Sequence, residues 1–183
     1  MMQTGVLLAG HGGQGVMFAG ELLAKSGITR NLEVAFLPSY GPEMRGGTAN
    51  CTVMLAEGEL DCPLPDHPPA AIVLNAMSYE RFQDAVAPNG LMIVNTSLVS
   101  ERKWREDLKV IALPLNDLAV KLGSERVLNL IALGAYLGAT KLLTLDDVMT
   151  TMEGLVSERH KHLLPLNRDA LKIGFDAAEK EKA

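Results

Sequence analysis

The sequence is poor in cysteine, and this limits the metal and redox chemistry it can perform alone. Only two cysteines occur among 183 residues, Cys51 and Cys62, and they form no C-x-x-C pair. A self-contained zinc or iron–sulfur site needs about four ligands at close spacing, so neither is expected in this chain. Since nothing marks the chain as secreted, we expect two reduced thiols in a cytoplasmic protein.

Clustered positive charge and long apolar runs are also lacking. The chain has 17 Lys and Arg against 22 Asp and Glu, a net charge of −5 without a basic run, which disfavours nucleic-acid binding. The apolar stretch at 127–140 has only 14 residues and contains Asn129, so it predicts a buried helix rather than a membrane span. The first twenty residues lack the basic start of a signal peptide and contain six glycines.

What remains is the composition of a globular protein. Apolar residues make up 48% and charged residues 21% of the chain, which excludes a disordered chain, a coiled coil and a collagen-like fibre. We find no internal repeat, low-complexity tract or clear linker. We therefore expect residues 1–183 to form one domain, which is long enough to bury a sizeable core.

Hydrophobic patterning predicts an α/β fold. Short apolar runs predict buried strands at 4–9, 33–37, 49–55, 70–74, 91–94 and 110–113. Helical spacing predicts helices at 16–26, 78–86, 101–106, 116–122, 127–139, 144–154 and 165–180. The first strand, helix and strand form a βαβ unit, which favours a parallel sheet. We expect a three-layer α/β/α sandwich with a mostly parallel sheet, a Rossmann-like start and a helical C-terminal third.

A glycine fingerprint follows the first predicted strand and opens the first predicted helix. It comprises Gly10, His11, Gly12, Gly13, Gln14 and Gly15. Glycine lets a phosphate approach the backbone, and a helix N-terminus offers free N–H groups, so this loop is a candidate anion or cofactor cradle. The alternative is that the glycines only make a tight turn.

An ordinary dinucleotide site is disfavoured. Such sites need an acid at the end of the second strand, where this sequence has Phe36, Leu37 and Pro38. Glu33 lies at the start of that strand, where it would point away.

A second glycine-rich loop follows the second predicted strand. Its candidate binding residues are Tyr40, Glu43, Arg45, Gly46 and Gly47. Arg45 is a lone cation suited to bidentate binding of a carboxylate or phosphate. Because ligands bind outside the carboxyl ends of parallel strands, the two loops should share one rim. Two alternatives to ligand binding stay open here. Arg45 could pair with Glu43 in solvent, or the segment could be a simple turn.

The other candidates are weaker. His160 and His162 are spaced i, i+2 and do not share a helix face, and His67 lies in a proline-rich loop, so all three are expected at the surface. The nine methionines have no regular spacing and are expected to fill the core. Without a G-x-S-x-G elbow, a hydrolase triad has no support. We assign no catalytic residue and no metal ligand.

Together the motifs resemble the gamma subunit of 2-oxoacid:ferredoxin oxidoreductases. The resemblance rests on G-H-G-G-Q-G-V from Gly10 and on S-Y-G-P-E-M-R-G-G-T-A-N from Ser39. N-L-I-A-L-G-A from Asn129 and N-R-D-A-L-K-I-G from Asn167 agree with it. The match spans nearly the whole chain, and the second motif is far more specific than a lone glycine fingerprint. The same domain also occurs in indolepyruvate oxidoreductases.

The resemblance implies a share in the oxidative decarboxylation of a 2-oxoacid with coenzyme A to an acyl-CoA. It implies that thiamine diphosphate and iron–sulfur clusters lie on partner alpha and beta subunits, with or without a delta subunit, which deliver electrons to ferredoxin. This chain has no G-D-G…N-N segment and no cluster cysteines. We therefore expect it to bind no cofactor alone and to be inactive in isolation. The sequence of the second motif is most like that of the 2-oxoglutarate enzymes. Pyruvate, branched-chain 2-oxoacids and indolepyruvate also fit as substrates of an enzyme with this subunit.

The resulting hypothesis is that both loops form a rim that meets the partner subunits and contacts coenzyme A. Arg45 would bind a coenzyme A phosphate or a partner carboxylate. Two alternatives are a standalone nicotinamide- or flavin-dependent oxidoreductase and a pure assembly module in which both loops bury against partners.

Overall fold

A computed structural model describes residues 3–40, 47–100 and 104–180 of the chain. In chain order its elements are β1 (Gln3–His11), α1 (Val16–Thr29), β2 (Glu33–Tyr40), β3 (Thr48–Ala56), β4 (Ala70–Val73), α2 (Ala76–Phe82), β5 (Leu91–Asn95), β6 (Lys109–Leu113), α3 (Leu115–Lys121), η1 (Glu125–Val127), α4 (Leu128–Thr140), α5 (Leu145–Leu155), η2 (Glu158–Leu163) and α6 (Leu164–Lys180).

The six strands form one mixed sheet in the order β2-β3-β1-β4-β5-β6. Strands β1, β4, β5 and β6 pair in parallel, as the buried apolar runs predicted. Strand β3 runs antiparallel to both neighbours, so it separates β1 from β2 although these two strands point the same way. The carboxyl ends of β1 and β2 therefore lie at one edge of the sheet, with the start of β3 between them.

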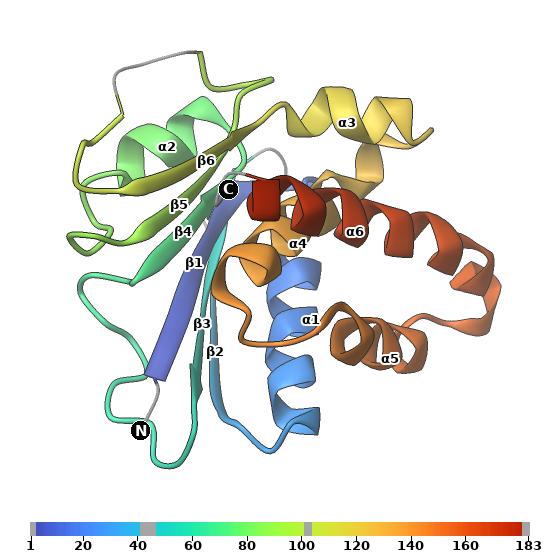
Figure 1. Ribbon diagram of the computed structural model, residues 1–183, viewed down its shortest axis with the longest axis horizontal. Helices are drawn as coiled ribbons and strands as arrows, with labels where there is room; N and C mark the ends of the chain where they lie inside the picture. Colours follow the sequence, from blue (N-terminus) through green and yellow to red (C-terminus); the bar gives the residue numbers. More distant parts are fainter. Residues whose placement is uncertain (1–2, 41–46, 101–103, 181–183) are drawn as a thin grey trace.

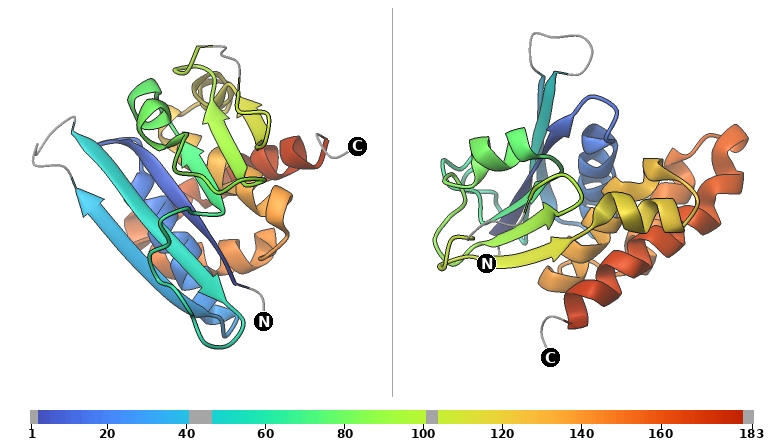
Figure 2. Two further views of the ribbon diagram at one scale, coloured as in Figure 1. Left: turned by 90° about the vertical axis from the view of Figure 1, so that its left-hand side faces the viewer. Right: turned by 90° about the horizontal axis from the view of Figure 1, so that it is seen from above.

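Helices cover both faces of the sheet and complete the predicted α/β/α sandwich. Figure 1 shows α2 on one side of the sheet and α1, α4, α5 and α6 on the other, and the view from above in Figure 2 agrees. Two separate hydrophobic clusters fill the interfaces. The larger one joins the sheet to the C-terminal helices and α1, and the smaller one joins it to α2, with Tyr79 and Val86 among its members. The helical C-terminal third is also confirmed.

Small residues let α4 and α6 cross with their backbones in close approach. Gly134 of α4 faces the carbonyl oxygen of Leu171, and Gly174 of α6 faces that of Ile131. A Cβ atom added at either glycine would overlap the facing carbonyl group. The two C-terminal segments that carry the family resemblance are thus the two sides of one helix crossing.

The prediction of a helix at 101–106 is wrong for the three residues of it that the structure describes. Residues 104–106 are not helical, and 101–103 lie outside the described residues. The guanidinium of Arg105 donates hydrogen bonds of 2.8 and 2.9 Å to the carbonyl oxygens of Gln83 and Val86. The Trp104 ring meets Tyr79 edge-on at 5.4 Å. These contacts with the end of α2 hold the segment in a non-helical path.

Other boundaries shift by a few residues. Helix α2 begins at Ala76 and ends at Phe82, whereas the prediction was 78–86. Its early start is explained by Asn75, which caps the helix: the Asn75 Oδ1 accepts a 2.9 Å hydrogen bond from Ser78 N. Strands β2 and β3 extend into the predicted loop at 39–48, as far as Tyr40 and from Thr48. A proline-rich loop at 57–69 lies on the surface, with His67 exposed as predicted.

Helix α5 begins with a complete capping box, as its sequence predicted. The Thr144 side chain accepts from Asp147 N at 3.1 Å, and Asp147 Oδ2 accepts from Thr144 N at 2.9 Å. Partial burial opposes ionisation of Asp147, but the hydrogen bonds with Thr144 and the charge of Arg30 outweigh it and lower the pKa of this carboxyl.

Asp147→Asn should therefore destabilise the protein in a pH-dependent way. A carboxyl whose pKa is lowered on folding adds stability that is present above its unfolded pKa of about 3.9 and is lost as pH falls through the folded value. We expect a loss of about 1 kcal/mol in the free energy of unfolding at pH 7. Urea titrations at pH 7 and pH 3 measure it, and Asp146→Asn in the same turn is the control. A difference that persists undiminished at pH 3 would contradict the assignment.

Candidate functional site

The loop that follows β1 lies beside the start of β3. The Gly12 N–H donates a 3.1 Å hydrogen bond to the carbonyl oxygen of Gly47. In the sheet register, His11 pairs with Thr48, and Tyr40 pairs with Ala49. The backbone thus brings the two predicted loops together at one edge, and the shared rim is confirmed for the residues that the structure describes. Glu43, Arg45 and Gly46 lie outside them.

Gln14 fixes the shape of this first loop from within. Its side chain is buried, only 6% exposed. Oε1 accepts 3.0 Å hydrogen bonds from His11 N and from Asn75 Nδ2, and Nε2 donates at 3.1 Å to the carbonyl oxygen of Leu74. One amide therefore joins the end of β1 to the end of β4 and the cap of α2. Gln14 therefore acts as a structural support of the loop.

Packing explains two of the glycines and conformation explains a third. A Cβ at Gly10 would lie 2.7 Å from Gln14 Oε1 and 2.9 Å from Val16 Cγ2. Gly15 has φ +74 and would press a Cβ into the Asn129 side chain, whose Nδ2 donates a 3.0 Å bond to the Gly15 carbonyl. Gly13 has φ +101 and open space where its Cβ would be. Around Gly13 the loop therefore leaves room for a ligand to approach the backbone.

A second asparagine supports the neighbouring strand ends. Asn95, fully buried at the end of β5, donates from Nδ2 to Leu74 O at 2.9 Å and to Asn116 Oδ1 at 2.8 Å. Its Oδ1 accepts from Leu115 N and Ser97 N. Asn75 and Asn95 each come directly after a buried strand, which is a sequence signal that our motif search missed.

The rim surrounds a crevice where the chain connections diverge. The helix that follows β1 lies on one face of the sheet, and the helix that follows β4 lies on the other (Figure 1). Adjacent parallel strands whose connections diverge in this way leave an opening at their carboxyl ends, the usual ligand position in open α/β sheets. His11 and Leu98 line both halves of this opening.

The two halves differ in chemistry. One is a groove of about 410 Å³ with mostly apolar walls, lined by Gly10, Thr48 and Asn75 and flanked by Met77 and Leu98, which are 66% and 44% exposed. The other, of about 360 Å³, is more polar, because Gln14, Asn116, Glu125 and Arg126 line it beside Leu98 and Leu128. The crevice can therefore receive a ligand with an apolar part and an anionic part.

Arg126 is the functional candidate that sequence reasoning missed. It lies in η1, 111 residues after Gly15 in the chain by their numbers, and its side chain reaches the glycine loop. Its guanidinium has no ion pair within 4.0 Å among residues 3–40, 47–100 and 104–180. Nothing in the local sequence S-E-R-V distinguishes it from a solvated surface arginine.

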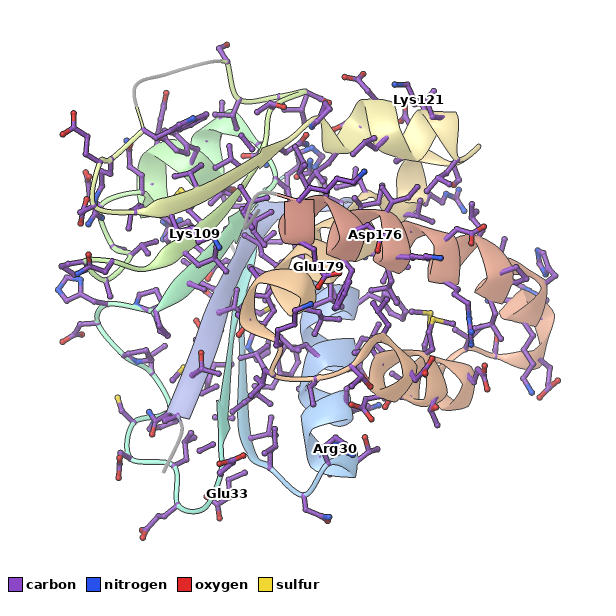
Figure 3. All side chains as sticks on the ribbon, viewed as in Figure 1. Arg30, Glu33, Lys109, Lys121, Asp176 and Glu179 are labelled. Carbon is purple, nitrogen blue, oxygen red and sulfur yellow. The ribbon has the colours of Figure 1, made fainter. Side chains whose placement is uncertain are left out.

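Glu33 is not placed to bind a ribose at this edge. Glu33 lies at the start of β2, at the opposite end of the sheet from the crevice, and its Oε2 accepts a hydrogen bond from Leu60 N at 3.1 Å (Figure 3). This is the geometry expected from its position in the sequence. Among the residues that the structure describes, the end of β2 therefore lacks the acid that an ordinary dinucleotide site has there.

The described residues do not fit a metal, a cluster or a thiol nucleophile. They contain no group of three or more His, Cys, Asp or Glu that could hold a metal ion. Both cysteines are free, and burial raises the pKa of the Cys51 thiol to about 12. His160 and His162 are exposed in η2, as predicted. Within the same residues, each helix is too short or too polar to cross a membrane.

The family assignment agrees with this geometry. Residues 5–177 match the model of the pyruvate ferredoxin/flavodoxin oxidoreductase family. The chain belongs to this family. A relative in the family, ketoisovalerate oxidoreductase subunit VorA of Methanothermobacter marburgensis, is 31% identical over 180 residues, covering 96% of this chain and 36% of its own length. The 2-oxoglutarate synthase subunit KorC of Methanocaldococcus jannaschii is 30% identical, covering 80% of each chain.

Length differs among these family members. The chain spans about a third of the first curated relatives, 36% of one VorA and 29% of another, but most of KorC. Among solved structures, the gamma subunit of a keto/oxoacid ferredoxin oxidoreductase from Geobacter sulfurreducens is 26% identical with a TM-score of 0.80, covering 96% of this chain and 98% of that one.

A second solved structure shares the fold. The 2-oxoglutarate:ferredoxin oxidoreductase of Magnetococcus marinus, solved with 2-oxoglutarate, coenzyme A and succinyl-CoA bound, has a TM-score of 0.90 at 21% identity, covering 98% of this chain and 32% of that one. The gamma-subunit resemblance seen in the sequence is confirmed by these findings.

Proposed function

We propose that this chain is the gamma subunit of a multisubunit 2-oxoacid:ferredoxin oxidoreductase. It supports the coenzyme A-dependent oxidative decarboxylation of a 2-oxoacid to an acyl-CoA, with 2-oxoglutarate as the favoured substrate. Residues 1–183 act as one gamma domain in the cytoplasm. Partner alpha and beta subunits, with or without a delta subunit, carry the thiamine diphosphate and iron–sulfur clusters and pass electrons to ferredoxin. Because the sequence has neither a G-D-G…N-N segment nor cluster cysteines, we assign the redox steps to those partners.

The observation that supports this proposal most is the divided crevice at the carboxyl ends of β1 and β4. Its apolar groove suits the pantetheine arm of coenzyme A, and Arg126 in its polar half suits a phosphate. The Magnetococcus marinus structure, which has the same fold, contains coenzyme A. Two observations support the preference for 2-oxoglutarate: the similarity to KorC, a 2-oxoglutarate synthase subunit, and the sequence of the second loop.

Kinetics of the assembled enzyme test the coenzyme A contact. Arg45→Ala and Arg126→Gln should each raise the KM for coenzyme A about tenfold or more with kcat little changed, because each removes a charge-assisted hydrogen bond worth roughly 1.5–3 kcal/mol. Arg159→Gln, an exposed arginine of η2 that does not line the crevice, is the control. Unchanged kinetics together with unchanged assembly for both variants would refute the contact.

One observation favours the assembly role as a second candidate. Met77 and Leu98 are exposed apolar side chains beside the groove, as in a surface that a partner subunit covers. If Arg45→Ala prevented complex formation on size exclusion without any effect on coenzyme A kinetics, the pure assembly module would be the better account. Tight dinucleotide binding by the isolated chain in calorimetry would favour the standalone oxidoreductase instead.

A further inference from the structure

A chain of hydrogen bonds fixes which way the Asn116 amide faces in the crevice. Asn116 lies in the first turn of α3, is half-buried, and lines the more polar half of the crevice together with Arg126. Its neighbour Asn95, at the end of β5, is fully buried. One hydrogen bond of 2.8 Å joins the two asparagine side chains. The direction of this bond determines which group Asn116 offers to a ligand.

The backbone settles that direction. The N–H groups of Ser97 and Leu115 lie 3.2 and 3.1 Å from the Asn95 amide, and a backbone N–H can only donate. Asn95 must therefore present its Oδ1 to them, which leaves its Nδ2 for the carbonyl oxygen of Leu74 and for Asn116. Because Asn95 Nδ2 donates, Asn116 must accept with its Oδ1. The Asn116 Nδ2 is the group that remains.

The Asn116 Nδ2 is a donor without a partner of its own. Among residues 3–40, 47–100 and 104–180 it makes no hydrogen bond, whereas Oδ1 is held by Asn95. The guanidinium of Arg126 is a second donor group in the same half of the crevice. Glu125 also lines this half, but no hydrogen bond or ion pair joins it to either donor. Two donor groups suit a ligand with several acceptor oxygens, and phosphate is such a group.

We propose that Asn116 Nδ2 donates a hydrogen bond to a phosphate oxygen of the ligand and that Asn95 is the positioning residue that orients it. The inference rests on the proposed function, in which this half of the crevice receives a phosphate of coenzyme A. Because the amide is oriented before the ligand arrives, binding does not have to order it. Asn95 is fully buried and does not line the crevice, so it acts only through Asn116.

Kinetics of the assembled enzyme test the Asn116 contact. Asn116→Leu removes the donor, and Asn116→Asp keeps the shape but turns a carboxylate oxygen toward the phosphate. We expect the KM for coenzyme A to rise about tenfold with Asn116→Leu and further with Asn116→Asp, with kcat little changed. Asn89→Asp is the matched control, because Asn89 is exposed just before the start of β5 and does not line the crevice.

A double-mutant cycle tests the positioning role of Asn95. Asn95→Asp keeps the acceptor for the two backbone N–H groups but replaces the Nδ2 donor by an oxygen. The Asn116 amide must then turn its Nδ2 toward that carboxylate and its Oδ1 toward the crevice. We expect the KM for coenzyme A to rise about tenfold, and the combination with Asn116→Leu to raise it no further than Asn116→Leu alone. Two independent structural effects would multiply instead.

Size exclusion checks that each variant assembles. If Asn95→Asp does not, Asn95→Ala takes its place in the same cycle. It adds no charge and frees the Asn116 amide to rotate, so the KM should rise less, and again no further in combination with Asn116→Leu.

The inference fails if Asn116→Leu leaves the KM at the wild-type value, or if the effects of the Asn95 and Asn116 substitutions multiply. Arg126→Gln in the same enzyme separates this failure from that of the proposed function. If Arg126→Gln raises the KM, the coenzyme A contact stands and only the role of Asn116 is wrong. If Arg126→Gln and Arg45→Ala are also without effect, the proposed contact with coenzyme A fails as well.

Discussion

Gly174→Val should lose most of the stability of the folded chain. At this position α6 lies against the backbone of α4, and any Cβ would overlap the carbonyl oxygen of Ile131 and come within 2.8 Å of Ala135 N. Both neighbours are backbone atoms of a buried helix, so neither can rotate away as a flexible side chain would. Overpacking of a core costs roughly 1–3 kcal/mol where side chains can adjust, and we expect more than about 3 kcal/mol here.

Separation of α4 from α6 would also disturb the crevice. Helix α4 carries Asn129, whose amide holds the Gly15 carbonyl at the start of α1. We therefore expect Gly174→Val to lower both the midpoint of urea unfolding and the yield of assembled enzyme. Circular dichroism during urea titration measures the first effect, and size exclusion measures the second.

Gly154→Ala is the matched control for the loss of a helical glycine. Gly154 lies in α5 with open space at its Cβ position. Alanine favours the helix by up to about 1 kcal/mol over glycine, so this variant should be neutral or slightly more stable. If Gly174→Val were as stable as Gly154→Ala, the close crossing of α4 and α6 would be wrong.

Gln14→Leu should have the second-largest effect, because it removes the amide that joins three segments at the rim. His11 N and Asn75 Nδ2 would lose their shared acceptor, whereas Leu74 O would keep the bond from Asn95. The Gln14 amide makes three hydrogen bonds, each worth roughly 0.5–1.5 kcal/mol net, so we expect a loss of about 3 kcal/mol in the free energy of unfolding. Urea titration measures it.

Gln3→Leu provides the control on the same strand. Gln3 lies at the other end of β1, and its bonds to Asp61 N and Cys62 O are exposed, at 3.0 and 3.4 Å. Water can replace them, so the cost should stay within about 0.5 kcal/mol. Equal losses from the two substitutions would show that the Gln14 amide is no more important than a surface contact.

Much of the fold could be predicted because local patterns carry the information. The apolar runs at β1, β4 and β5 are buried on both faces of the sheet, and this is the pattern that parallel strands require. The capping box at Thr144 needs only residues within one turn, so its sequence was sufficient. Residues 104–106 were mistaken for helix because Arg105 and Trp104 are held by contacts with α2, which lies about twenty residues earlier in the chain.

The candidate site was predictable only in part, for the same reason. The glycine loop at Gly10–Gly15 was visible in the sequence, and so was its shared edge with the second loop. The roles of its residues were not, since Gln14 proved to be an internal support and Gly15 a packing requirement for Asn129. Arg126 had no sequence signal, because its importance depends on which side chains lie opposite it.

By itself, the sequence determined the α/β/α layers, the rim at the carboxyl ends of β1 and β2, and the lack of cysteines for a self-contained cluster. Hydrophobic period, turn residues and composition set these features, and all are local or additive properties. Only the tertiary structure decided that β3 lies antiparallel between β1 and β2, that Asn129 reaches across 114 residues to Gly15, and that Arg126 lines the same crevice as Gly13. These features depend on contacts between distant segments, which form only when the strands and helices pack together.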